Sequence, residues 1–253
     1  MSNVEYSKNQ LDLFNEIKVG TGNIVVGAVA GSGKSFSIHE AIRRIPIHKK
    51  VISLAFNKAI AEELKQKLPS RVDVSTLHGF GLRMCYKHYG KVVISESKQF
   101  KFIKPIIDRA RKEVEHQTYD SVREKDLALK TFDKKKGRQQ YLMIQLMNLF
   151  RMNLYVNLED LKLVNSHYGI DAPDEVISWT AEAIGHMRKY NRVSTDTTFV
   201  VDFTDMIYLP ATVDMDIDQY DYIFVDECQD LNMAQQTILQ KMMKEKSRFI
   251  AVG

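Results

Sequence analysis

The sequence predicts an α/β fold in which a parallel β-sheet flanked by helices is interrupted by an inserted all-helical block. Apolar runs and amphipathic helical segments alternate over residues 1–90, and the alternation resumes over 196–253. Between them, residues 91–195 are charged and poor in glycine, and their apolar residues recur at helical spacing. We therefore expect a sheet domain made of 1–90 and 196–253, and a helical subdomain made of 91–195.

The first part of the chain repeats a strand–helix unit three times. Its first apolar run has no polar residue, as in strands that are buried on both faces of a parallel sheet. Asn57 precedes the second helical segment as an N-cap, and Pro69 ends it. The expected strands are 24–29, 51–56 and 72–75, and the expected helices are 34–44, 57–68 and 77–88.

The helical block and the last part of the chain are interpreted from the same spacing. In the block, Gly137 and the three lysines before it predict a turn between two helices. After the block we expect helices at 203–209 and 231–244, and strands at 222–225 and 249–252. Alternation of this kind implies parallel strands joined by right-handed crossovers.

The composition is that of an ordinary globular protein. Of the 253 residues, 44% are apolar and 27% are charged. No apolar stretch reaches the roughly 18–20 residues that a membrane span needs, and the polar N-terminus has no signal-peptide core. Cys85 and Cys228 are the only cysteines, and no CxxC pair occurs. We therefore expect no membrane partner and a reducing compartment, cytoplasmic or otherwise intracellular.

The net charge of +4 is mild but unevenly distributed. Residues 91–140 contain 14 Lys and Arg against 8 Asp and Glu, and the rest of the chain is slightly acidic. Such a basic stretch indicates either a contact with a polyanion or a solvated helical surface.

A glycine-rich loop follows the first expected strand. Residues 28–35 read A-V-A-G-S-G-K-S, and a helical segment begins at their end; the strict pattern has glycine where this chain has Ala28. In a phosphate-binding P-loop, backbone N–H groups surround the phosphates, the lysine reaches the β- and γ-phosphates, and the hydroxyl ligates Mg²⁺. The expected nucleotide-binding residues are Ala30, Gly31, Ser32, Gly33, Lys34 and Ser35, of which Ser35 also binds Mg²⁺.

An acidic pair ends the apolar run at 222–225. Asp226 and Glu227 would lie at the carboxyl end of a parallel strand, where ligands bind in folds of this type. Phosphoryl transfer to water needs one carboxylate on Mg²⁺ and a second that takes a proton from the water. We assign the first role to Asp226 and the second to Glu227, so the loop and the pair together predict a nucleoside triphosphatase.

The acidic pair belongs to a longer box, V-D-E-C-Q-D at 225–230. This box resembles the D-E-x-Q-D box of superfamily 1 DNA helicases of the UvrD/Rep type, and their P-loop is similar to 28–35. The resemblance implies a RecA-like core with a helical subdomain inserted before the box. The other similar segments, in the family's order, are 6–10 (Q motif), 54–59 (motif Ia), 75–80 (T-x-H-x-F), 202–206 (D-F-x-D-L) and 251–253 (the opening of motif III).

The resemblance implies ATP and Mg²⁺ as cofactors and gives roles to further residues. Gln10 would contact adenine. Lys34 and Glu227 would act in catalysis, and Gln229 would sense the γ-phosphate or couple hydrolysis to motion.

The resemblance also implies a track for a single strand of DNA. Aromatic rings stack on any base, whereas amide, hydroxyl and imidazole groups bind phosphates. The alternative for Phe56 and Phe80 is a core aromatic, and for His78 a structural histidine. The implied residues are Phe56, Asn57, Thr76, His78 and Phe80.

The function implied by the resemblance is the N-terminal ATPase core of an ATP-dependent DNA helicase or translocase, with a role in DNA repair or replication. Its partner would be single-stranded DNA or a junction of single strand and duplex. In this family a second RecA-like domain follows motif III and supplies an arginine to the γ-phosphate. Because such arginines are worth about 10³–10⁵ in rate, we expect little hydrolysis and no unwinding by residues 1–253 without that C-terminal half.

Two other classes of function stay open. One is a nucleic-acid-binding or interaction module that derives from a helicase and is catalytically inactive; DNA-stimulated ATP turnover distinguishes it from a motor. The other is an unrelated P-loop ATPase or nucleotide kinase, against which 75–80 and 225–230 argue, since a kinase needs neither segment.

Overall fold

The chain divides into two compact units in the computed structural model, which describes residues 5–27, 33–193 and 198–253. The sheet unit comprises Met1–Met84 and Val213–Gly253, and the helical unit comprises Cys85–Thr212. The helical unit therefore extends beyond the expected subdomain 91–195 at both ends.

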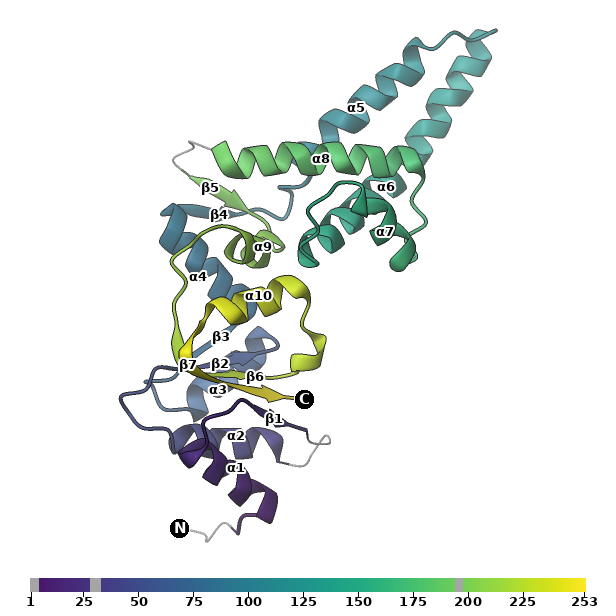
Figure 1. Cartoon of the computed structure of the whole chain (residues 1–253). Coiled ribbons are helices and arrows are strands. Elements are labelled where there is room, and N and C mark those ends of the chain that lie inside the picture. The colour runs from purple at the N-terminus through teal and green to yellow at the C-terminus, as the bar shows by residue number, and fades with distance from the viewer. Residues whose placement is uncertain (1–4, 28–32, 194–197) are drawn as a thin grey trace. The chain divides into compact units, whose positions relative to one another are not determined.

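The sheet unit is built on a five-stranded parallel sheet with the strand order β1-β7-β6-β2-β3 (Figure 1). The central strand, β6, leads into the acidic pair, and β7 separates it from β1. The α/β class and the parallel sheet predicted from the sequence are confirmed. The strands are β1 (Ile24–Val26), β2 (Val51–Ala55), β3 (Asp73–Thr76), β6 (Tyr220–Val225) and β7 (Met243–Val252).

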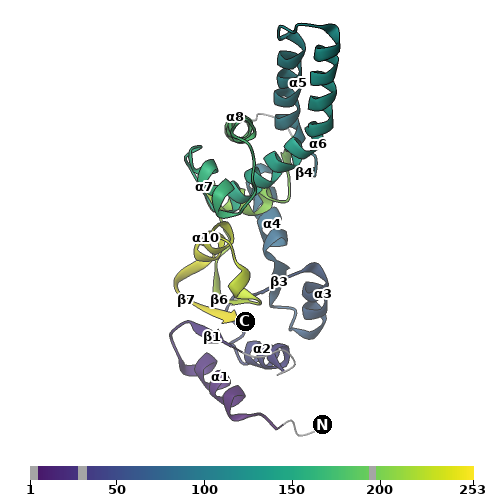
Figure 2. The same ribbon diagram turned by 90° about the vertical axis from the view of Figure 1, so that its right-hand side faces the viewer.

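Helices cover both faces of this sheet. On one face α1 (Lys8–Val19), α2 (Lys34–Arg43) and α3 (Lys58–Lys67) share an apolar core with the strands. On the other face lies α10 (Met233–Lys241), as Figures 1 and 2 show. All five residues of β2 are buried, as expected for a strand covered on both sides.

Two elements of the sheet unit differ from the prediction. The first is α1, which the apolar pattern did not indicate, although Ser7 and Gln10 form a capping box at its start. The second is β7, which begins at Met243 where the sequence predicted the end of a helix. Residues 244–247 are polar, so no apolar period marks them as strand, and they form an irregularity in the pairing of β7 with β6.

The helical unit consists of helices around an apolar core, together with two short parallel strands. The last turn of α4 (Leu77–Tyr89) opens it. No helix in the described part of the chain is long and apolar enough to cross a membrane. The remaining elements are β4 (Val92–Ile94), α5 (Phe100–His116), α6 (Val122–Met152), α7 (Asp160–His167), α8 (Asp174–Val193), β5 (Phe199–Val201) and α9 (Asp205–Thr212).

The turn predicted at Gly137 does not exist, because α6 runs through it without a break. Glycine costs about 1 kcal/mol in a helix relative to alanine. After it, Leu146 and Phe150 are fully buried in the core of the helical unit. The burial of each such side chain contributes about 1.5–3 kcal/mol, which outweighs the cost of the glycine.

Candidate nucleotide and nucleic-acid site

A small cavity brings the expected Mg²⁺ ligands together. Ser35, in the first turn of α2, and Asp226, at the end of β6, both line a cavity of about 40 Å³. The Asp226 N–H donates to the carbonyl of Leu54 at 3.1 Å, which fixes the chain as it leaves β6. Mg²⁺ binds one or two protein oxygens and completes its shell with water and phosphate oxygens, so this pair fits a Mg-nucleotide. Among the described residues, no cluster of three or more His, Cys, Asp or Glu offers another metal site.

The glycine-rich loop lies only partly within the described residues. Ala30, Gly31, Ser32 and the side chain of Lys34 fall outside them. Gly33 has a φ of 80°, in the left-handed region where a side chain is strained. Since α2 begins at the next residue, a glycine is required where the loop enters the helix, and the N–H groups of the first turn are available to an anion.

Gln10 connects the starts of α1 and α2. Its Oε1 accepts a hydrogen bond from the Ser7 N–H at 2.9 Å, and its Nε2 donates to Ser37 Oγ at 2.9 Å. Ser37 Oγ in turn donates to the carbonyl of Gly33 at 3.0 Å. Gln10 therefore lies beside the end of the glycine-rich loop, with both ends of its amide bonded within the protein. The S-x-x-Q spacing of a capping box in the sequence accounts for the bond between Ser7 and Gln10.

A second cavity joins the acidic pair to two of the expected DNA contacts. Phe56, His78, Asp226 and Glu227 line this cavity of about 190 Å³ at the carboxyl edge of the sheet. The ring of Phe56, just after β2, is 64% exposed. Burial lowers the pKa of His78, which keeps its imidazole neutral near pH 7. The expected catalytic base and part of the expected strand path therefore share one cavity.

Glu227 has an unusual backbone conformation. Its φ of 52° and ψ of 45° place it in the left-handed region, which is strained for residues other than glycine. Gln229 Nε2 donates to its Oε2 at 2.6 Å. Strain of this kind concentrates at functional sites, so the conformation agrees with the role expected for Glu227.

Three of the expected DNA contacts have structural roles. Asn57 accepts a hydrogen bond from the Ile60 N–H at 2.9 Å and so caps α3, and Thr76 Oγ1 accepts one from the Gly79 N–H at 3.0 Å. Phe80 is fully buried, and its ring meets that of Tyr220 at a centroid distance of 6.3 Å. A ring without exposed surface cannot stack on a base, so the stacking role of Phe80 was wrong and Phe80 is a core aromatic.

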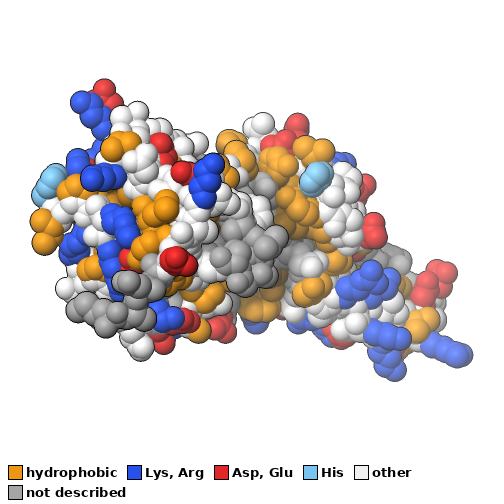
Figure 3. All heavy atoms as spheres, turned by 90° about the horizontal axis from the view of Figure 1, so that it is seen from below, with side chains coloured by type: hydrophobic (Ala, Val, Ile, Leu, Met, Phe, Trp, Pro, Cys, Tyr) orange, Lys and Arg blue, Asp and Glu red, His pale blue; other side chains and the backbone are white. Residues whose placement is uncertain are grey.

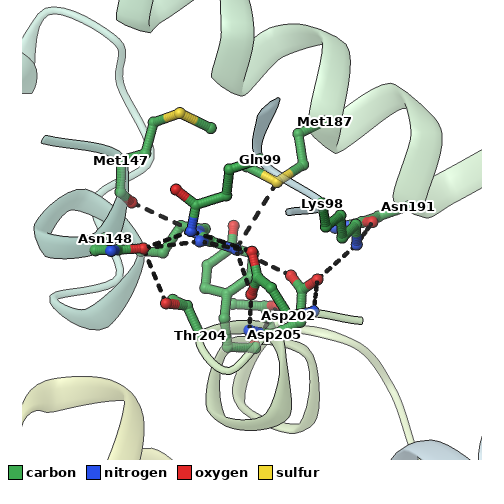
Figure 4. Close-up of polar contacts among 12 residues, drawn as sticks. Lys98, Gln99, Met147, Asn148, Met187, Asn191, Asp202, Thr204 and Asp205 are labelled. Atoms are coloured by element: carbon green, nitrogen blue, oxygen red, sulfur yellow. Dashed lines mark hydrogen bonds and ion pairs between the residues drawn. The ribbon is translucent and has the colours of Figure 1, made fainter. Parts of the chain in front are cut away.

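The D-F-x-D segment forms a buried ionic network in the helical unit (Figure 4). Arg151 contacts Asp202 at 3.1 Å and Asp205 at 3.0 Å, and Lys98 contacts Asp205 at 2.5 Å. The two aspartates also accept each other's backbone N–H. Burial alone would raise the pKa of Asp202, but the charge and hydrogen bonds of Arg151, the Asp205 N–H and the charge of Lys98 together hold that pKa below its ordinary value. The segment, which lies between β5 and α9, is thus joined to α6 and to Lys98 just before α5.

The architecture of the sheet unit is that of a RecA-like P-loop domain, because the loop leads into α2 and the acidic pair follows the central strand. Residues 10–253 match the family model described as the UvrD/REP helicase N-terminal domain. The chain belongs to this family, as its motifs predicted, and carries the N-terminal part of an ATP-dependent helicase core. No curated protein matches the chain.

Proposed function

We propose that residues 1–253 bind Mg-ATP and single-stranded DNA as the ATPase core of a DNA helicase or translocase. The position of Asp226 is the observation that carries the proposal. Asp226 lines the cavity that Ser35 lines and also the cavity that Phe56 and His78 line. Asp226 thus links the nucleotide site to the path of the DNA strand, because it borders both.

The residues divide the chemistry of hydrolysis among them. Ser35 and Asp226 hold Mg²⁺, which neutralises charge on the β- and γ-phosphates when bound. Lys34 binds the same phosphates. Glu227 takes a proton from the attacking water, and Gln229, bonded to its carboxylate, links that group to the γ-phosphate. Hydrolysis and unwinding require the arginine of a second RecA-like domain.

Exposed cations on α6 support binding of the polyanion. Four Lys and Arg residues recur along one face of this helix, and all four are exposed. Within the described residues none of them forms an ion pair. Figure 3 shows Lys and Arg side chains gathered at the right-hand end of the view, where the α5–α6 hairpin ends. The four residues, the α6 stripe, are Arg123, Lys130, Lys134 and Arg138.

Two binding measurements test the proposal. A fluorescent ATP analogue should bind the wild-type chain in the presence of Mg²⁺, and Lys34→Ala should weaken that binding at least tenfold. A labelled oligo-dT should bind with an affinity that falls steeply as salt is raised. Equal nucleotide affinity of wild type and Lys34→Ala would disprove the P-loop assignment, and salt-independent binding would disprove the phosphate contacts.

Two finer expectations complete the proposal. The substrate of the whole helicase is a single strand beside a duplex, in DNA repair or replication. The compartment is reducing and intracellular, since both Cys85 and Cys228 are free thiols. If DNA does not stimulate turnover once a second RecA-like domain is supplied, the chain is instead a catalytically inactive binding module.

A further inference from the structure

His39 lies in the cavity of the expected Mg²⁺ ligands and has no role in the function proposed above. It follows Ser35 by four residues on α2, so the two side chains project from the same face of the helix. Ser35 and His39 both line the 40 Å³ cavity, together with Ser53 of β2 and Asp226. His39 is only 8% exposed, so it belongs to the interior of the sheet unit.

The imidazole has an unused polar atom in this interior. Within the described part of the chain, His39 Nε2 is buried without a hydrogen-bond partner. Buried polar atoms nearly always have a partner, either in the protein or in an ordered water. The rest of the cavity wall is apolar, so Ser35, Ser53 and Asp226 supply its other polar groups. Its apolar lining is Ile38, Ile60, Leu64, Phe224, Val225 and Val252.

The cavity is large enough for a bridging water. A water needs about 10–15 Å³ of such space and two to four polar partners. The cavity offers about 40 Å³, and Ser35, His39, Ser53 and Asp226 are the polar residues that line it. A water that bonds to His39 Nε2 can also donate to the Asp226 carboxylate, which only accepts. The carboxylate would then keep one orientation toward the metal.

We propose that His39 is a positioning residue for the Mg²⁺ site, which it orders through a water shared with Asp226. The inference rests on the proposed function, because it takes Asp226 as a ligand of nucleotide-bound Mg²⁺. Groups behind metal ligands fix the direction of those ligands, and their loss typically costs 10–100-fold in metal affinity. His39 touches neither nucleotide nor metal, so its effect is confined to the part of nucleotide affinity that depends on Mg²⁺.

The test compares nucleotide binding with and without metal. The dissociation constant of mant-ADP is measured in Mg²⁺ and in EDTA for wild type, His39→Leu, His39→Gln and Leu64→Met. We expect His39→Leu to reduce the gain that Mg²⁺ gives by about tenfold or more, with the affinity in EDTA unchanged. His39→Gln keeps a polar group near the Nε2 position and should restore most of the gain. Leu64→Met changes the same cavity without a polar group and should behave as wild type.

The outcomes separate this inference from the proposed function. If the wild type gains nothing from Mg²⁺, the proposed Mg-nucleotide site itself fails. If Mg²⁺ raises the nucleotide affinity of His39→Leu as much as that of the wild type, the positioning role is overturned. The same holds if His39→Leu loses affinity equally in Mg²⁺ and in EDTA. A second measurement needs no folded Leu variant: the ¹⁵N signal of His39 Nε2, assigned with His39→Gln, should shift when Mg²⁺ is added to the mant-ADP complex. An unmoved signal overturns the inference.

Discussion

At residue 227 the backbone has a conformation that favours glycine, although the chemistry requires a carboxylate there. The left-handed conformation costs an L-residue roughly 1 kcal/mol. We expect Glu227→Gly to unfold with a free energy about 1 kcal/mol higher than Glu227→Ala, because both lose the carboxylate and only glycine relieves the strain. Urea unfolding of the two variants measures the difference. A Glu227→Ala variant as stable as Glu227→Gly would show that the backbone is not strained at this position.

The imidazole of His78 gives the second prediction at the scale of a residue. Burial lowers its pKa, so at pH values below about 6.5 the unfolded chain binds a proton that the folded chain does not. The free energy of unfolding therefore falls as the pH drops through this range. We expect His78→Gln to gain stability relative to wild type between pH 7.5 and pH 5.5, by at most about 1.4 kcal/mol per pH unit.

Urea unfolding at the two pH values measures this difference, and groups common to both proteins cancel in the comparison. The change in the difference with pH is the relevant quantity, because the substitution itself has a cost that does not depend on pH. A difference between the two proteins that stays constant would contradict a lowered pKa at His78.

At the scale of an element, the continuity of α6 makes Gly137 an ordinary helical position. A Cβ at Gly137 would meet no atom within 4 Å, and the residue is exposed. We expect Gly137→Ala to raise the free energy of unfolding by up to about 1 kcal/mol. The matched control is Gly90→Ala, where a φ of 74° makes alanine strained and the stability should fall. Thermal unfolding measures the stability of both variants. A lower stability of Gly137→Ala would contradict the continuous helix and favour the turn predicted from the sequence.

The elements that the sequence predicted best are those whose burial produces a regular pattern of apolar residues. The strand β2 is apolar throughout because both its faces are covered, and its expected and observed starts agree at Val51. The break at Gly137 was inferred from glycine and charge alone, whereas the distant apolar core decides the conformation of α6. The first half of β7 is polar and mostly exposed, and its register with β6 is irregular before Arg248, so no apolar period in the sequence marks it as a strand.

The buried network of Arg151 gives a prediction about how α6 is held to α9. Replacing Arg151 by Met leaves Asp202 and Asp205 with too little positive charge, which should cost about 3–5 kcal/mol. The double variant Arg151→Met/Asp202→Asn keeps the Lys98–Asp205 pair balanced and should recover part of that loss. Urea unfolding of the three proteins measures the effect, and a double variant less stable than Arg151→Met would contradict it. The exposed Arg109–Glu182 pair is the control, because its removal should lower the free energy of unfolding by at most about 1 kcal/mol.

At the scale of the whole molecule, the site is assembled from residues far apart in the sequence. Motif order was enough to predict that Ser35 and Asp226 meet, because each motif fixes a strand end or a helix start. It was not enough to decide which aromatics face outward. Phe56 and Phe80 both lie in segments that resemble the family's motifs, yet one is exposed and the other is in the core. His39 belongs to no motif, because a lone histidine on a helix leaves no pattern in the sequence.

The α6 stripe gives a prediction about DNA binding by the whole molecule. Each phosphate contact that is lost from a single strand reduces the slope of log affinity against log salt by about 0.7. The triple variant Lys130→Ala/Lys134→Ala/Arg138→Ala should therefore lower the slope for oligo-dT by about 2 and weaken binding equally for all sequences. Lys104→Ala is the control, because Lys104 is paired with Asp108 and should leave the slope unchanged. If the triple variant keeps the wild-type slope, the stripe is a solvated surface, and the DNA contacts lie on the sheet unit alone.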